Sequence, residues 1–346
     1  MLEGMQAACG DDGSISYAKG ANILNDPVLA DRLNVHNRDN HSVTIDERSS
    51  GMMIAEALEK AHAADVIVAV IGEAKEHSGE SSSRTSLDIP QEQRDMLRAL
   101  RQTGKPVVAV VMTGRPLVLR EEAGLADALL VSWFGGTEAG NALADVLYGR
   151  VNPSGKLPVT FPYNEGQIPV YHSHEPTGRP YSGKFNKFTN GYLDLPDDVA
   201  HKTGLFPFGH GLSYTTFSHE QPRVGFSRDK DRAIIKTNVT NNGSVAGQEV
   251  VQLYVTDLVA SSSRPVRELK GFKKIMLQPG ETKEIVFSLS RKDVSFSIAN
   301  DITDTRRRWE EGEFLFATGT SSQSLQETKV YWRSATRQNH IEYKMS

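Results

Sequence analysis

The run Val66–Ile71 constrains the fold of this chain more than any other stretch, because every residue in it is apolar. An apolar run of this length, ended here by Gly72, is typical of a strand that is covered on both faces of a sheet. Two further runs, Val107–Met112 and Ala128–Trp133, are also predominantly apolar. Strands of this kind occur in parallel sheets with helices in the outer layers, so the pattern predicts an α/β fold.

Helical patterns alternate with these strands. Residues 51–62 carry apolar side chains at helical spacing, Pro90 is placed to open the next helix, and a further helix is predicted after Gly136. Short connections between such elements favour helices on both faces of the sheet. We therefore predict a three-layer α/β sandwich with a mostly parallel sheet over residues 1–162.

The first fifty residues are less regular. We predict a short helix over Leu2–Cys9 and a strand over Ser14–Lys19, while residues 25–50 are polar and are expected to be irregular. A doubly wound domain normally opens with a strand, and none precedes the first helix. We therefore expect the α/β domain to be truncated at its N-terminus.

The chain changes character after residue 162. Residues 163–222 are rich in Gly, Pro, Tyr and His without periodicity, and their many rings predict a linker packed against a neighbouring surface. One or two of these rings are candidates for sugar stacking, and ordinary interdomain packing is expected for most. Residues 223–333 show short alternating strands between turn signals, which predict an all-β sandwich. Residues 334–346 form a polar tail.

Composition excludes several functional classes. The 346 residues are 38% hydrophobic with a formal net charge of −4, and no apolar run reaches the length of a membrane span, so we expect neither nucleic acid nor a membrane as partner. Cys9 is the single cysteine, which excludes an internal disulfide. The first residues lack a signal-peptide pattern. No nucleotide-binding or GxSxG motif and no metal-ligand spacing is present, so no metal or other cofactor is predicted.

The loop after Val66–Ile71 is the candidate functional site. In open α/β sheets, ligands gather at the carboxyl ends of the strands, and this loop brings several titratable groups to such an end. A solvated surface loop with idle acids is equally compatible with the residues alone. The titratable groups are Glu73, Glu76, His77, Glu80 and Arg84.

Several local stretches carry a resemblance to a known family. Together with the order of the predicted domains, they resemble the C-terminal half of glycoside hydrolase family 3 β-glucosidases, in particular the bacterial periplasmic branch. The resemblance implies that the β domain is fibronectin-III-like. The matching stretches include Ser78–Thr85, Asn152–Pro158, Thr177–Tyr181, Phe206–Phe217 and Arg264–Val266.

The resemblance implies a retaining O-glycosyl hydrolase acting on terminal β-D-glucosyl residues of oligosaccharides or β-glucosides. Such enzymes use two carboxyl groups about 5–5.5 Å apart, a nucleophile and a general acid/base. In this family the acid/base is a glutamate from the second domain. The matching residue here is Glu80, and Glu73 and Glu76 are the competing carboxylates. Arg84 is interpreted as an orienting ion-pair partner, with Glu73 and Tyr181 as further supporting or substrate-binding residues. His77 is interpreted as a solvated loop histidine, with a proton-partner role left open.

The chain also departs from the family pattern. The family nucleophile is an aspartate on an N-terminal (β/α)8 barrel, and these residues contain neither a barrel nor an aspartate in that motif. We therefore expect no nucleophile in this chain, a barrel domain as partner in cis or in trans, and no useful hydrolysis by the chain alone. A non-catalytic module that binds carbohydrate or protein is the alternative. The resemblance implies a periplasmic or secreted location for the full-length family member.

Overall fold

The computed structural model describes residues 1–35, 43–181, 183–196, 204–297 and 307–334, and these form two compact units. The domain boundaries expected near residues 162, 222 and 333 stay predictions. The predicted polar tail lies, apart from Ser334, outside the described residues. The first unit comprises Met1–Val151, Phe161–Pro169 and Gly204–Phe206, and the second comprises Asn152–Thr160, Val170–Thr203 and Pro207–Ser346.

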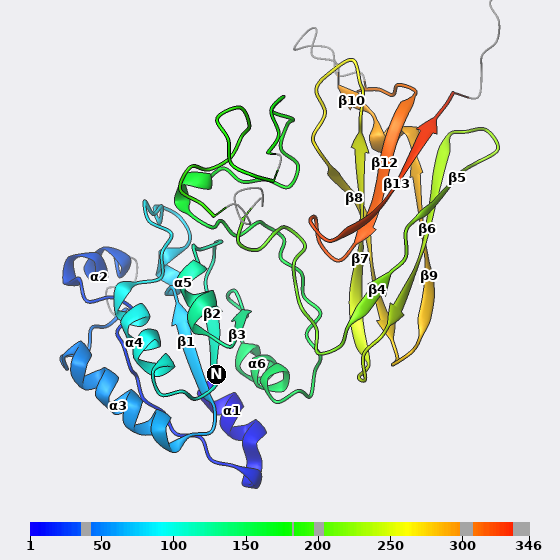
Figure 1. Ribbon diagram of the computed structural model, residues 1–346. Helices are drawn as coiled ribbons and strands as arrows, with labels where there is room; N and C mark the ends of the chain where they lie inside the picture. The colour runs from blue at the N-terminus through cyan, green and yellow to red at the C-terminus, as the bar shows by residue number, and fades with distance from the viewer. Residues whose placement is uncertain (36–42, 182, 197–203, 298–306, 335–346) are drawn as a thin grey trace, which may run out of the picture. The chain divides into compact units, whose positions relative to one another are not determined.

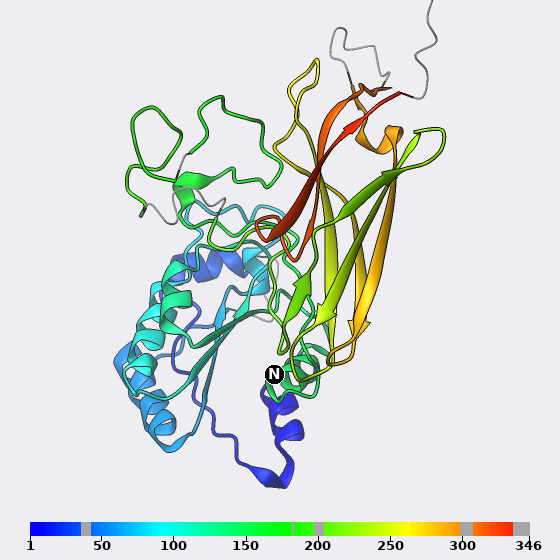
Figure 2. The same cartoon turned by 45° about the vertical axis from the view of Figure 1, so that its right-hand side comes forward.

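The first unit is built on a three-stranded parallel sheet in the order β1-β2-β3, which confirms the predicted α/β class. Helices α3, α4 and α5 lie on one side of the sheet, and α1 and α6 lie on the other (Figures 1 and 2). Right-handed crossovers place α4 and α5 on the same face, because the strand order advances in one direction. The elements are α1 (Leu2–Cys9), α2 (Pro27–Leu33), α3 (Ser50–Ala63), β1 (Ile67–Gly72), α4 (Gln91–Arg101), β2 (Val107–Met112), α5 (Arg120–Leu125), β3 (Ala128–Val131) and α6 (Ala139–Leu147).

Burial alternates along β1. Ile67, Ala69 and Ile71 are at most 9% exposed, whereas Val70 is 45% exposed. The prediction that this strand is covered on both faces is therefore wrong at Val70. β1 lies at an edge of the described sheet, and it is less completely buried than the central strand β2.

Three expectations for local structure in this unit are wrong or incomplete. Residues Ser14–Lys19 form no strand, since none of the described strands pairs with them. The stretch 25–50 is not wholly irregular, because it contains α2. Helix α5, between the second and third strands, was not predicted.

The second unit contains the predicted all-β sandwich of two antiparallel sheets. One sheet has the order β13-β12-β7-β8, and in the other β6 pairs with β9 along one edge and with β4 and β5 along the other. Phe314, Phe316 and Trp332 are fully buried in the core between them. The strands are β4 (Phe217–His219), β5 (Arg223–Phe226), β6 (Arg232–Asn241), β7 (Gly247–Asp257), β8 (Glu268–Leu277), β9 (Thr282–Ser290), β10 (Phe296–Ser297), β11 (Arg307–Arg308), β12 (Gly312–Gly319) and β13 (Leu325–Trp332).

Among the helices of the described ranges, none combines the length and the apolar character that crossing a bilayer requires.

Candidate active-site loop

Gly72 sets the start of the loop that follows β1. Its φ of 127° suits glycine, and a Cβ atom at this position would come within 2.0 Å of the Met112 carbonyl oxygen. Gln93 of α4 bonds both backbone groups of Gly72, accepting from its N–H at 2.7 Å and donating to its carbonyl at 2.9 Å. The Glu73 N–H then donates to the Met112 carbonyl at 2.8 Å. The loop therefore leaves the sheet from a fixed point at the ends of β1 and β2.

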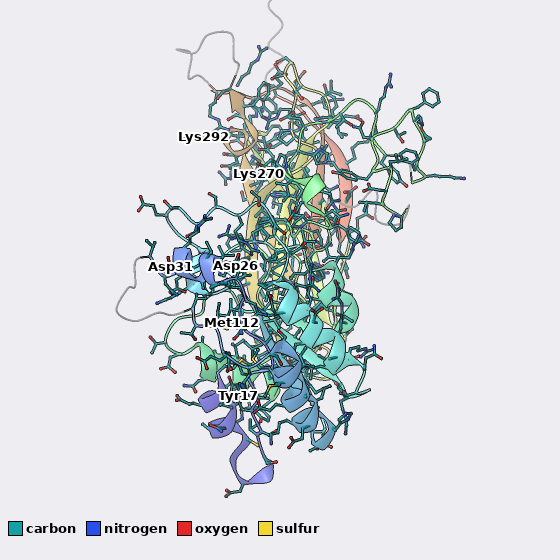
Figure 3. The ribbon with its side chains drawn as sticks, turned by 90° about the vertical axis from the view of Figure 1, so that its left-hand side faces the viewer. Tyr17, Asp26, Asp31, Met112, Lys270 and Lys292 are labelled. Atoms are coloured by element: carbon teal, nitrogen blue, oxygen red, sulfur yellow. The ribbon has the colours of Figure 1, made fainter. Side chains whose placement is uncertain are left out.

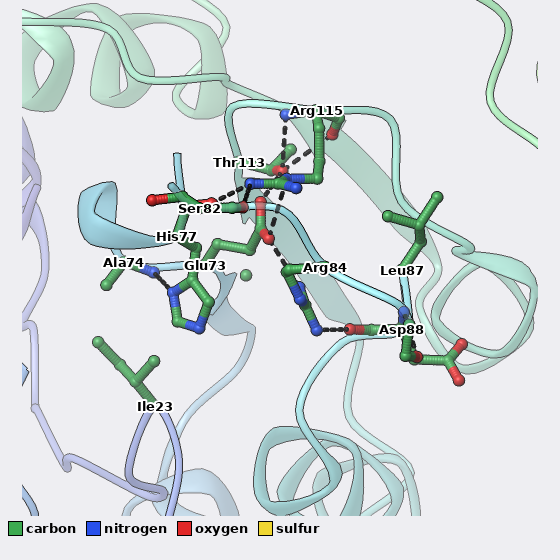
Figure 4. Close-up of polar contacts among 12 residues, drawn as sticks. Ile23, Glu73, Ala74, His77, Ser82, Arg84, Leu87, Asp88, Thr113 and Arg115 are labelled. Atoms are coloured by element: carbon green, nitrogen blue, oxygen red, sulfur yellow. Dashed lines mark hydrogen bonds and ion pairs between the residues drawn. The ribbon is translucent and has the colours of Figure 1, made fainter. Parts of the chain in front are cut away.

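Glu73 lies at the centre of a buried ionic network (Figure 4). Its side chain is fully buried, and Arg84 Nη1 donates to its Oε1 at 2.6 Å. Arg115 Nε lies 3.4 Å from the same oxygen, and the Thr113 hydroxyl donates to Oε2 at 2.7 Å. Both carboxylate oxygens thus have cationic or hydroxyl partners, as a buried charge requires. This arrangement fixes the position of the Glu73 side chain.

Arg115 connects the network to the rest of the loop. Its Nη2 donates to the carbonyl of His77 and, at 3.0 Å, to the carbonyl of Ser82 (Figure 4). The Ser82 hydroxyl in turn donates to the Glu76 carbonyl at 3.1 Å. One guanidinium from the end of β2 therefore holds the backbone on both sides of Glu80.

Glu80 lies at the exposed tip of this loop. Its neighbours Gly79 and Ser81 have φ values of 112° and 57°. A positive φ at a residue other than glycine costs about 1 kcal/mol or more and persists only where the surroundings impose it. The loop thus presents a solvent-accessible carboxylate from a strained turn on an anchored base.

His77 is buried, at 5% exposed, so the interpretation as a solvated loop histidine is wrong. Its Nδ1 accepts a hydrogen bond from the Ala74 N–H at 3.1 Å, which leaves the proton of the neutral ring on Nε2 (Figure 4). Burial lowers the pKa of His77, and the positive charge of Arg84 lowers it further. The ring is therefore neutral at pH 7.

Arg84 and Tyr181 complete the residues predicted for the site. Arg84 bonds Glu73 and also donates to the Asp88 carbonyl at 3.0 Å, so its charge is engaged away from the tip of the loop. Tyr181 belongs to the second unit, where its ring lies against the backbone of Gly191. Its proposed part in substrate binding stays a prediction.

Three residues of this network were not predicted from the sequence: Gln93, Thr113 and Arg115. The sequence did contain a signal for two of them. Thr113 and Arg115 directly follow the second predicted strand, and parallel strands end at the same edge of a sheet. A Cβ atom at the intervening Gly114 would meet Ser78 Oγ at 2.1 Å, so the two loops touch there. In the described part of the chain, no group of three His, Cys, Asp or Glu side chains could hold a metal ion.

Comparison with family models gives two matches. The model described as the glycosyl hydrolase family 3 C-terminal domain matches residues 1–214. The model described as a fibronectin type III-like domain matches residues 249–322. The first match covers more than half of the chain and includes the whole Glu73–Arg84 loop.

Individual proteins are similar over most of this chain. A periplasmic β-glucosidase of Salmonella typhimurium is 50% identical over 300 residues, 86% of this chain and 38% of that protein. A β-xylosidase of Formosa agariphila is 35% identical over 94% of this chain and 40% of its own length. The chain thus spans about two fifths of these curated relatives.

Solved structures of β-glucosidases are also similar to this chain. The crystal structure of a β-glucosidase from Listeria innocua in complex with isofagomine matches with a TM-score of 0.76 and 36% identity, over 83% of this chain and 39% of that one. A β-glucosidase structure from Erythrobacter marinus matches with a TM-score of 0.79 and 36% identity, over 95% of this chain and 42% of its own.

Proposed function

This chain belongs to glycosyl hydrolase family 3, and from that membership we propose that it is the C-terminal part of a retaining β-glucosidase in which Glu80 is the general acid/base. The substrates are β-glucosides and oligosaccharides with a terminal β-D-glucosyl residue. The observation that supports this role is the build of the loop: an exposed Glu80 on a turn whose two stems are fixed by Arg115 and by the buried Glu73.

The proposed chemistry has two steps. In the first, Glu80 donates its proton to the glycosidic oxygen while a nucleophilic carboxylate attacks the anomeric carbon, so that the bond to the leaving group breaks and a glycosyl ester forms. In the second, Glu80 takes a proton from water, the resulting hydroxide attacks the anomeric carbon, and the ester bond breaks. The nucleophile comes from a (β/α)8 barrel in cis or in trans.

The anchored base of the loop has a defined part in this proposal. A free guanidinium beside Glu80 would favour the ionised carboxylate and weaken it as an acid. Arg84 and Arg115 are instead paired with Glu73, so they can fix the loop without directing a free charge at its tip. Glu73, Arg84 and Arg115 are therefore positioning residues in this proposal.

Location and activity of the isolated chain follow from the same proposal. The relative from Salmonella typhimurium is named a periplasmic enzyme, and we propose a periplasmic or secreted location here. Without the nucleophile, the first step has no attacking group, so the isolated chain is expected to hydrolyse no β-glucoside at a useful rate.

Reconstitution tests this function. Hydrolysis of 4-methylumbelliferyl β-glucoside is measured with the chain alone, and then with the barrel portion of the Salmonella relative added. We expect no turnover by the chain alone and turnover that rises and saturates with added barrel. Glu80→Gln should abolish it, and Glu59→Gln, which removes a 76% exposed carboxylate on α3, should not. Parallel assays with 4-methylumbelliferyl β-xyloside test whether the enzyme prefers glucose or xylose as the glycone.

Two outcomes would count against the proposal. Turnover by the chain alone that Glu80→Gln removes would mean that a carboxylate of this chain acts as nucleophile. No turnover at any barrel concentration would favour the non-catalytic carbohydrate- or protein-binding module.

The leaving group supplies a sharper test of the acid role. A 2,4-dinitrophenolate departs without a proton, so Glu80→Ala in the reconstituted enzyme should slow the first step far less for the dinitrophenyl glucoside than for the methylumbelliferyl glucoside. Azide should then restore turnover and give β-glucosyl azide, because it attacks the glycosyl ester without a general base. Equal losses on both substrates would remove Glu80 from the acid role.

A further inference from the structure

A hollow of about 1010 Å³ lies between the Glu80 loop and the segment that carries α2. One wall is the polar loop, from Lys75 to Ser86, and includes Glu80. The opposite wall is mostly aliphatic. Its side chains are Leu24, Leu29, Arg32, Leu33 and Val35.

The aliphatic wall is held in place by its own contacts. The Asp26 carboxylate caps α2 (Figure 3). It accepts hydrogen bonds from the N–H groups of Val28 and Leu29 at 2.9 and 3.2 Å. At the other end, the Asn34 side chain donates to the Val43 carbonyl at 2.7 Å and accepts from its N–H at 3.1 Å. The wall is therefore formed before any ligand arrives.

The wall and the Glu80 loop also share a small core. Leu24, Ala30 and Val43 are buried together, and Ala74 of the loop packs against them. Because Ala74 directly follows the buried Glu73, the same stem that anchors Glu80 also positions α2. The two walls of the hollow therefore keep a fixed relation to each other.

Apolar side chains remain exposed inside this hollow. Leu29 is 40% exposed and Val35 is 48% exposed. A single exposed aliphatic residue is ordinary, but here such residues converge on one concave surface opposite a candidate catalytic carboxylate. Arg32 adds a guanidinium to the same wall, and a guanidinium stacks well on the face of an aromatic ring.

We propose that this hollow is the subsite for the leaving group, and that its α2 wall selects planar aromatic aglycones. The inference rests on the proposed function, because an acid that protonates the glycosidic oxygen must lie beside the group attached to that oxygen. Leu29 and Leu33 contact the edge and one face of the ring, and Arg32 stacks on it. These are specificity-determining residues for aryl β-glucosides.

The test measures binding to the chain as it exists, so it needs no turnover. The probes are 4-methylumbelliferone and glucose, followed by saturation-transfer NMR. We expect the umbelliferone to bind and glucose alone not to bind. Leu29→Ser should weaken umbelliferone binding by roughly tenfold through lost apolar contact, and Arg32→Ala by roughly threefold.

A matched control lies on the same helix. Val28 is 60% exposed on α2 and does not line the hollow, so Val28→Ser should leave binding unchanged. Equal binding by the Leu29→Ser and Val28→Ser proteins would overturn the proposal. Octyl β-glucoside binding as tightly as the umbelliferone, with no effect of Arg32→Ala, would overturn its aromatic part.

The reconstituted enzyme separates this inference from the proposed function. We expect Leu29→Ser to raise KM for the methylumbelliferyl glucoside several-fold more than KM for cellobiose, with kcat little changed. If the reconstituted enzyme is active and Leu29→Ser leaves KM for the methylumbelliferyl glucoside unchanged, the proposed subsite is overturned and the proposed function is not. Activity that survives Glu80→Gln would overturn the function itself, and the hollow would then be no leaving-group subsite.

Discussion

Glu73 and Glu80 lie seven positions apart in one loop, and their surroundings give them opposite properties. The side chain of Glu73 is fully buried, with Arg84, Arg115 and Thr113 around it, whereas Glu80 is exposed at a strained tip. A carboxylate that two guanidiniums hold serves structure, and an accessible one is free to exchange a proton with a substrate. Residue type alone therefore does not assign the acid/base.

This difference predicts that the same substitution, Glu to Gln, destabilises the fold at position 73 and has little effect at position 80. Glu73→Gln removes the anion that compensates two largely buried guanidiniums, so it should lower the free energy of unfolding of the first unit by about 2–4 kcal/mol. Glu80→Gln should change it by less than about 0.5 kcal/mol, because the side chain is exposed. Hydrogen exchange of peptides covering β2 and β3 reports on this unit. Similar protection in both variants would contradict the anchoring role.

At the level of single residues, the sequence predicts part of the candidate site and not the rest. Glu73, His77, Glu80 and Arg84 were visible because they cluster in one short loop after a strand. The Glu73–Arg115 pair was not, because it depends on two loops meeting where neighbouring strands end, and on the register of those strands. His77 was misjudged for a related reason, since burial of a loop residue is decided by what packs over it.

At the scale of elements, the strands β1 and β2 were predictable because continuous apolar runs mark them, and β2 begins and ends as predicted. Helix α2 was missed because its seven residues are too few to establish a period. The local signal was the pair Asp26-Pro27, an N-cap followed by proline in the first turn. The predicted strand Ser14–Lys19 failed because no sequence pattern reports whether a pairing partner exists.

The cap of α2 can be tested directly. Asp26→Ala removes both hydrogen bonds to the first turn and should destabilise the helix by about 1 kcal/mol, seen as several-fold faster hydrogen exchange over residues 27–33. Asp31→Ala, in the interior of the same helix, is the control and should not speed exchange (Figure 3). If both variants exchange like the unaltered chain, the cap does not hold the wall of the hollow.

At the scale of the whole molecule, the two units were predictable as classes, α/β and all-β, because their periodicities differ. The ionic contacts inside the second unit were not predictable. Glu249 is 2% exposed and Lys156 Nζ lies 3.1 Å from its Oε1, although these residues are far apart in the chain. Lys156 also donates to the Gly211 carbonyl at 2.8 Å, so a turn-rich segment is fastened to the sandwich by a buried pair.

His219 makes this region sensitive to pH. Neither ring nitrogen has a hydrogen-bond partner among the described residues, and burial, with a smaller effect of Lys156, lowers its pKa from 6.5 to about 4. Between these two values the unfolded chain binds a proton that the folded chain does not. Stability should therefore fall as the pH falls from 6.5 towards 4, by an amount on the order of 2 kcal/mol, and His219 should contribute no pH dependence above that window.

The comparison that isolates this effect is His219→Phe against the unaltered chain. Thermal melts at pH 7 and pH 5 are followed by tryptophan fluorescence, to which Trp309 and Trp332 of the second unit contribute beside Trp133 of the first. Other titratable groups also change the pH dependence of stability in both proteins. Burial raises the pKa of Asp257 to about 6, so Asp257 opposes the effect of His219 and favours the folded chain as the pH falls. The difference between the two proteins cancels these groups. We expect the variant to gain several degrees in Tm over the unaltered chain on going to pH 5. A Tm difference that is the same at both pH values would show that folding does not shift the pKa of His219, and would overturn the assignment.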